Sequence, residues 1–180
     1  HNGMAYYYLG RLELARERPQ KALEMFTLAV RSKEANPEYR VAYADLLVEI
    51  GGRRNQKKAV SEYSGIITAH ETRPPGTAGY DRITDVYLKR GETHMMLLQY
   101  GEALKDFEKA MDLNPLRADT VTAYAAGLVK RQRYQEASRY LAAVLQENPN
   151  YPAAHFWVGV IHYESRKLLD AKRHLLRAIM

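Results

Sequence analysis

One short pattern recurs five times along this 180-residue chain. It is clearest between Tyr100 and Pro115, where the residues follow the spacing Y-x-x-A-x-x-x-F-x-x-A and a proline comes after them. The first alanine of the pattern recurs at positions that are 37, 44, 34 and 34 residues apart. These anchor alanines are Ala22, Ala59, Ala103, Ala137 and Ala171. A recurring unit of this length indicates a stack of similar structural units, each of which buries its apolar face against the next.

Each unit is predicted to be a pair of helices. A second small residue lies upstream of every anchor alanine, so two helices can approach closely between them. These upstream residues are Gly10, Ala44, Gly91, Ala125 and Gly159. Prolines separate the units, at positions that a helix interior does not tolerate. The predicted helices span residues 4–17, 20–34, 37–50, 55–71, 77–98, 100–113, 118–131, 134–147, 152–165 and 168–180.

The pattern resembles that of tetratricopeptide-repeat proteins over nearly the whole chain, most specifically in the third and fourth copies. Two of the four spacings equal the 34-residue period of that family. The resemblance implies an all-α fold, a right-handed superhelical solenoid of about five helical hairpins. We expect a single array with repeats at about 4–36, 37–75, 77–116, 118–150 and 152–180. The segment around 71–76 is the expected hinge.

Composition limits the compartment and the class of protein. The chain is 46% hydrophobic and 27% charged, as in ordinary globular proteins. It has no cysteine, which excludes disulfides and thiolate metal sites and leaves the cytoplasm and the bacterial periplasm or envelope open. No apolar run reaches the roughly 18 residues of a membrane span, so a soluble chain is expected. The last residues continue an apolar helical stripe, which suggests a fragment of a longer array that could dimerise through its truncated C-terminal end.

The resemblance also implies a concave groove, lined by the first helix of each hairpin, that binds an extended peptide or a partner helix. The predicted groove residues are Tyr7, Tyr8, Arg11, Asp45, Lys89, Glu92, Phe156, Val160 and Tyr163, and Val41, Val48, Leu88, Thr122, Ala126 and Val129 lie on the same helix faces. This lining favours an apolar or mixed peptide, or an amphipathic helix. The alternative is that some of these residues, above all Val41 and Leu88, only pack between hairpins.

Within the family, modules that bind the acidic C-terminal tails of chaperones use lysine, asparagine and arginine in the groove. Only Arg11 and Lys89 have a fitting charge at the corresponding positions, and Asp85 would repel a carboxylate. We therefore predict that the partner is not an acidic chaperone tail.

Basic residues gather near the turns inside the predicted hairpins. The predicted basic rim consists of Arg53, Arg54, Lys57, Lys58, Lys130, Arg131 and Arg133. Such a rim could bind nucleic acid or another anionic surface. The alternative is that these residues stay solvated and compensate the dipoles of helix C-termini.

Motifs of catalysis and cofactor binding are not found in the sequence. His155 and His162 are seven residues apart, but no cysteine and no HExxH motif accompanies them, so neither a metal site nor a cofactor is expected. His162 is expected in the core or at its boundary. The sequence therefore predicts a scaffold that binds another protein and that could organise a multiprotein assembly, not an enzyme. The alternative is the regulatory or targeting segment of a larger enzyme.

Overall fold

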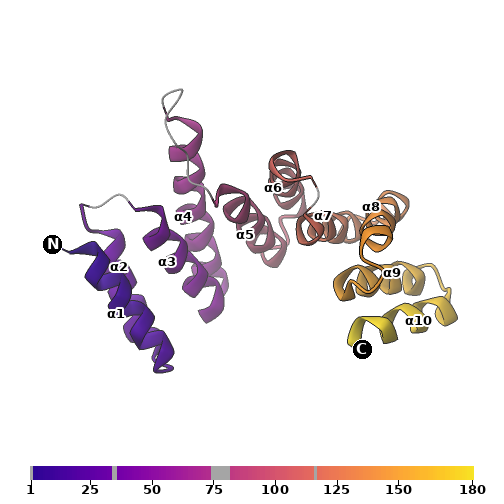
Figure 1. Ribbon diagram of the computed structural model, residues 1–180, viewed down its shortest axis with the longest axis horizontal. Helices are drawn as coiled ribbons and strands as arrows, with labels where there is room; N and C mark the ends of the chain where they lie inside the picture. The colour runs from indigo at the N-terminus through magenta and orange to yellow at the C-terminus, as the bar shows by residue number, and fades with distance from the viewer. Residues whose placement is uncertain (1, 34–35, 74–81, 116) are drawn as a thin grey trace. The chain divides into compact units, whose positions relative to one another are not determined.

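The computed structural model describes residues 2–33, 36–73, 82–115 and 117–180, which form ten α-helices and no strand (Figure 1). The prediction of an all-α fold is confirmed over these residues. The helices are α1 (Gly3–Ala15), α2 (Pro19–Val30), α3 (Pro37–Ile50), α4 (Arg53–Glu71), α5 (Ile83–Met96), α6 (Tyr100–Leu113), α7 (Ala118–Lys130), α8 (Tyr134–Glu147), α9 (Pro152–Glu164) and α10 (Leu168–Ile179).

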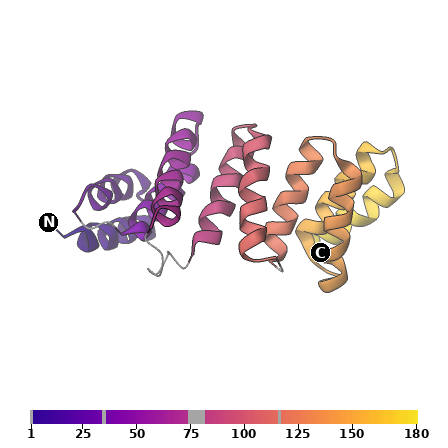
Figure 2. The same cartoon turned by 90° about the horizontal axis from the view of Figure 1, so that it is seen from above.

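The contacts divide the chain into two compact units, His1–Leu97 and Leu98–Met180. The first unit holds α1 to α5 and the second holds α6 to α10, and within each unit every helix packs against the next one along the chain (Figure 2). In the second unit α9 also packs against α7. The division falls inside the predicted third repeat, 77–116, so the single array remains a prediction.

Small residues set the closest approaches between helices. All five anchor alanines are buried. At Gly159 an added Cβ would lie 2.7 Å from Cγ of Leu175 and 3.2 Å from its backbone nitrogen, and at Gly10 it would lie 2.5 Å from the ring of Phe26. The upstream glycine and the large residue after the anchor alanine therefore meet inside the hairpin, and glycine is required where they meet.

The turns inside three hairpins share one geometry. Glu17, Gln132 and Arg166 have φ between 57° and 61°, the left-handed conformation that ends many helices. The next residue in each turn donates its N–H to a carbonyl five residues earlier, at 2.9 Å, as in a Schellman motif. In the second hairpin the turn instead uses Gly51 and Gly52, both with positive φ. The glycines alone make this turn, so α4 begins at Arg53.

Most predicted helix boundaries agree with the structure to within two residues, and two differ more. Helix α2 ends at Val30, not at residue 34, because Arg31 is already its C-terminal cap. Helix α5 begins at Ile83, whereas the predicted start at residue 77 lies outside the described residues, as do residues 74–76 of the predicted hinge at 71–76. A smaller difference matters for the charges, because α4 begins two residues early and takes Arg53 and Arg54 into its first turn.

Candidate functional site

An aromatic cluster lies where α1 meets α2 and α3 in the first unit. Tyr7 stacks on Tyr39, with ring centroids 5.2 Å apart, and its centroid is 6.0 Å from that of Phe26. The guanidinium of Arg11 lies 5.9 Å from the Tyr7 ring. Tyr8 contacts Tyr7 edge to face, yet it is 58% exposed. Tyr7 therefore holds the helices together, and Tyr8 is the aromatic side chain that α1 offers to solvent.

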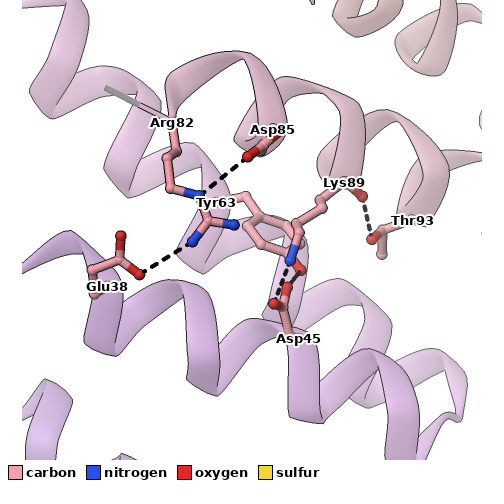
Figure 3. Close-up of polar contacts among 7 residues, drawn as sticks. All are labelled: Glu38, Asp45, Tyr63, Arg82, Asp85, Lys89 and Thr93. Atoms are coloured by element: carbon pink, nitrogen blue, oxygen red, sulfur yellow. Dashed lines mark hydrogen bonds and ion pairs between the residues drawn. The ribbon is translucent and has the colours of Figure 1, made fainter. Parts of the chain in front are cut away.

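Two further predicted groove residues contact each other directly. The ammonium of Lys89 on α5 forms an ion pair with the carboxylate of Asp45 on α3 (Figure 3). The hydroxyl of Tyr63 on α4 donates a hydrogen bond of 2.6 Å to the same carboxylate. Burial and the Asp45 carboxylate raise the pKa of Tyr63 well above its usual value, so the phenol stays protonated. These three groups join three consecutive helices of the first unit.

A second ion pair joins α3 to the N-terminal cap of α5. Arg82 contacts Glu38 at 3.7 Å and Asp85 at 3.2 Å (Figure 3). Glu38 and Asp45 are seven residues apart, so the two acids lie two turns apart on one face of α3. Arg82 and Lys89 have the same spacing at α5, so each base can meet one acid. Sequence reasoning missed Tyr63 and Arg82. The two ion pairs could have been predicted from the repeat spacing. Each acid precedes its base by 44 residues, which is also the distance between the anchors Ala59 and Ala103.

Other residues of the predicted groove lie inside the units. Five of them are buried among neighbouring helices, which agrees with the alternative that they pack within the stack. These are Val41, Leu88, Thr122, Ala126 and Val129. Val48 and Val160 are half-buried, and Glu92 is exposed on α5. Few of the aliphatic positions are therefore open to a ligand.

An open apolar pocket lies on α9 and α10 in the second unit, with a volume of about 790 Å³. The predicted groove residues Phe156 and Tyr163 line it and are 44% and 57% exposed. The second helix contributes a mostly apolar wall that includes Leu168, Leu176 and Ile179. This pocket exposes more large apolar side chains than a solvated helix pair requires.

The basic residues form separate groups in the two units. Arg53, Arg54, Lys57 and Lys58 are exposed on the first turns of α4, and the Lys58 ammonium lies 5.0 Å from the ring centroid of Tyr43. Arg53 and Arg54 lie in the first turn of α4, where the dipole of that helix repels positive charge, but they also come three and four residues after Ile50, at the C-terminus of α3, where a cation is favourable.

In the second unit the dipole interpretation fits two residues of the predicted rim, because Arg131 is the C-terminal cap of α7 and Lys130 precedes it. Lys130 lies in the last turn of α7, where a cation is favourable, and also contacts the Trp157 ring at 5.6 Å. Arg131 is exposed, and Arg133 pairs with Glu136 at 2.6 Å. Part of the positive charge predicted for this rim is therefore neutralised.

Three histidines meet between α9 and α10. His155 is buried, and its Nε2 lies 2.9 Å from the carbonyl oxygen of Pro149 while its Nδ1 lies 3.0 Å from Nδ1 of His174. A carbonyl oxygen only accepts, so His155 donates from Nε2 and accepts from His174 at Nδ1. The His162 ring stacks on His174 with centroids 5.5 Å apart. Both ring nitrogens of His155 therefore have a hydrogen-bond partner, which explains how this polar side chain is accommodated in the core of the last hairpin.

The described residues contain neither a candidate metal site nor a candidate membrane span. No group of three or more histidine, aspartate or glutamate side chains in the described ranges has an arrangement that could hold a metal ion. Among the same residues, no helix combines the length and apolar character needed to cross a bilayer.

Comparison with known proteins identifies the fold. A family model described as "Tetratricopeptide repeat" matches residues 98–155. The structure is similar to that of MamA 41-end from Desulfovibrio magneticus RS-1, with a TM-score of 0.80, 15% identity and coverage of 99% of this chain and 93% of that one. It is also similar to YrrB, "a TPR protein with an unusual peptide-binding site", with a TM-score of 0.68, 19% identity and coverage of 97% and 83%. No curated protein sequence matches significantly.

Proposed function

We propose that this chain, which is a tetratricopeptide-repeat protein, is a scaffold that binds a segment of another protein on the faces of its first helices. The observation that carries the proposal is the exposure of aromatic side chains at those faces. Tyr8 projects from α1 in the first unit, and Phe156 and Tyr163 project from α9 in the second. Exposed aromatic side chains supply much of the binding free energy in protein interfaces. The unusual peptide-binding site of YrrB is consistent with this use of the fold.

The chemistry of these faces favours an apolar or mixed segment over an acidic tail. Lys89 is one of only two groove residues whose charge fits a terminal carboxylate, and that charge is already paired with Asp45. A carboxylate ligand would have to displace Asp45 and leave the Tyr63 hydroxyl without its acceptor. The ion pair therefore supports the expectation that chaperone tails do not bind.

A peptide selection tests the proposal. Peptides are selected from a displayed random library against the full chain, and their affinities are measured by fluorescence anisotropy. We expect Tyr8→Ala or Phe156→Ala to weaken the selected peptides by about tenfold, because each removes an exposed aromatic anchor. Tyr7 is not substituted, because its ring packs on Tyr39 and its loss would perturb the fold.

Matched controls lie on second helices of the predicted hairpins, one in each unit. Leu28 on α2 and Leu113 on α6 are also exposed large apolar residues, so Leu28→Ala and Leu113→Ala remove similar surface elsewhere. All variants are compared by circular dichroism. If the controls weaken binding as much as the first-helix variants, or if neither first-helix variant has an effect, the proposed faces are not the binding site.

One observation favours a second candidate, an anionic partner that binds the first turns of α4. Four exposed cations gather there against the helix dipole, an arrangement that is unfavourable for the helix alone. A nucleic acid or another polyanion would be attracted to them. Binding of a single-stranded oligonucleotide that falls steeply with salt and is lost in Arg54→Glu would support this candidate; equal binding by that variant would refute it.

A further inference from the structure

We infer that Trp157 and the alanines of α7 beside it form a subsite for a large aliphatic side chain of the bound protein segment. The subsite consists of Ala123 and Ala126 on α7 and of Trp157 and Val160 on α9, and we call it the α7–α9 stripe. The inference rests on the proposed function and deepens it, because it specifies one subsite and the chemistry of the side chain that binds there.

Contacts and spacing place these residues on one face of the second unit. Helix α7 packs against α9, and the ammonium of Lys130 lies 5.6 Å from the centroid of the Trp157 ring. Ala126 and Ala123 precede Lys130 by four and seven residues, so they lie on the same side of α7, one and two turns before it. Val160 follows Trp157 by three residues on α9. Trp157 is therefore turned toward the side of α7 that carries the two alanines.

The position of Trp157 stays accessible when another hairpin packs beside it. The equivalent residues one and two periods of 34 residues earlier are Ala123 and Lys89. Ala123 is half-exposed although α9 packs against its helix, and the side chain of Lys89 is 31% exposed. Trp157 is half-exposed in the same way. Its accessibility is therefore a property of this position within the repeat.

The α7–α9 stripe is uncharged where the corresponding face of the first unit is charged. The places of Lys89 and Glu92 on α5 are taken by two alanines on α7, and by Trp157 and Val160 on α9. In the first unit Lys89 pairs with Asp45, whereas none of the four residues of the stripe could pair with a charged ligand. A charged side chain would be desolvated against these apolar groups without a counter-ion, which is unfavourable. An aliphatic side chain meets no such cost and buries apolar surface.

The Trp157 ring is held in place by its neighbours. Phe156 contacts it edge to face, with centroids 5.0 Å apart, and the ammonium of Lys130 covers it. Ordering a mobile side chain costs binding free energy, so an aromatic ring that is already ordered favours binding. The indole N–H has no acceptor among the residues that the structure describes, and it can donate to a backbone carbonyl of the ligand. The subsite therefore offers a rigid aromatic surface and one hydrogen-bond donor.

Intrinsic fluorescence tests the inference, because Trp157 is the only tryptophan of the chain. Random peptides that lack tryptophan are displayed and selected against the full chain, and the binders are synthesised. We expect the bound peptides to shift the emission to shorter wavelength, because an aliphatic side chain displaces water from the indole. Replacing the large aliphatic residues of each peptide one at a time by glutamate or lysine should identify one position that abolishes the shift and weakens binding about tenfold or more.

A matched pair of substitutions locates the subsite. Ala123→Glu places a charge on the α7–α9 stripe, at the position that Lys89 occupies in α5, so a long polar side chain is compatible with the helix there. Ala143→Glu places the same charge on an exposed alanine of α8. We expect Ala123→Glu to weaken the selected peptides about tenfold, whereas Ala143→Glu has little effect. Trp157→Ala, measured by the anisotropy of labelled peptides, should weaken them at least as much, and circular dichroism checks the fold of each variant.

Each other outcome overturns the inference. Binding that leaves the emission unchanged, or equal losses in Ala123→Glu and Ala143→Glu, would exclude the subsite. Peptides whose acidic residues control the shift, in place of their aliphatic ones, would show that Lys130 is the group recognised. Sedimentation that shows a dimer dissolved by Ala123→Glu would identify a second copy as the occupant. If selected peptides depend on Tyr8 but not on Trp157, the proposed function stands and only this inference fails, whereas a library without any binder would contradict both.

Discussion

The hydroxyl of the buried Tyr63 donates a hydrogen bond of 2.6 Å to Asp45, whose carboxylate also pairs with Lys89. One carboxylate on α3 therefore satisfies a buried donor from α4 and a cation from α5. A buried hydroxyl without an acceptor loses the hydrogen bonds that water would give it, so this arrangement links side-chain chemistry to the stacking of the first unit.

Asp45→Ala should lower the free energy of unfolding by about 1–3 kcal/mol, because it leaves the Tyr63 hydroxyl without its acceptor and Lys89 without its partner. Tyr63→Phe, which removes the donor instead, should cost less. Glu38→Ala breaks the more exposed pair with Arg82 and should cost at most about 1 kcal/mol. Urea unfolding followed by circular dichroism measures all three. Equal costs for Asp45→Ala and Glu38→Ala would show that the shared carboxylate has no special role.

Gly159→Ala should destabilise the second unit by about 1–3 kcal/mol, although alanine favours helices over glycine by about 1 kcal/mol. The added Cβ would lie 2.7 Å from Cγ of Leu175, and the nearby backbone nitrogen limits how far α10 can yield. Gly101 is the matched control, because there the nearest atom is a flexible guanidinium nitrogen of Arg131 at 3.4 Å. Gly101→Ala should be neutral or stabilising in thermal unfolding. A stable Gly159→Ala variant would contradict the close packing of α9 on α10.

Acid should destabilise the hairpin of α9 and α10. Burial lowers the pKa of His174, and His155 and His162 on α9 and Arg177 and Arg173 on its own helix lower it further. The unfolded chain, with a histidine pKa of about 6.5, therefore binds more protons as the pH falls. The stability that comes from keeping this histidine neutral is therefore present in full above about pH 6.5 and is lost as the pH falls below that value.

The melting temperature measured between pH 7.5 and 5 tests this dependence. His174→Gln should flatten the curve partly, and the double variant His70→Gln/His174→Gln should flatten it more, because burial also lowers the pKa of His70. An unchanged slope in the double variant would mean that other groups control the acid sensitivity.

Charge reversal at the start of α4 should stabilise the helix. Arg54 lies in a first turn that contains no acidic residue, so Arg54→Gln should add a few tenths of a kcal/mol, and Arg54→Glu about 0.5–2 kcal/mol. The gain should shrink in 1 M salt, because exposed charges are screened. A loss of stability in Arg54→Glu at low salt would indicate that the cluster makes a stabilising contact within the chain.

The repeated pattern determined most of the fold because small residues recur where helices must approach. Gly10, Gly159 and the anchor alanines were recognisable for that reason, and they are all buried. Helix ends were harder where several residues could form the turn. The left-handed conformation of Gln132 and Arg166 has no signature in the residue type, and Arg53 and Arg54 resembled turn residues although Gly51 and Gly52 complete the turn.

The candidate site was predictable only in part, because a first-helix position can face either a ligand or the next helix. Tyr7 and Tyr8 are adjacent and identical in the sequence, yet one packs on Tyr39 and the other is exposed. Asp45 and Lys89 were both predicted to line the groove, and only the 44-residue register indicates that they meet each other. Contacts between side chains from different helices depend on the length of each turn, which the repeat pattern alone leaves open.

Photocrosslinking of selected peptides tests the central claim most directly. A photoreactive phenylalanine analogue is placed at Tyr8 or Phe156 on first helices, and at the similarly exposed Leu28 or Leu113 on second helices. We predict crosslinks from a first-helix position and few from the second helices. Crosslinks that arise equally or mainly from Leu28 and Leu113 would show that partners bind elsewhere and would contradict the claim.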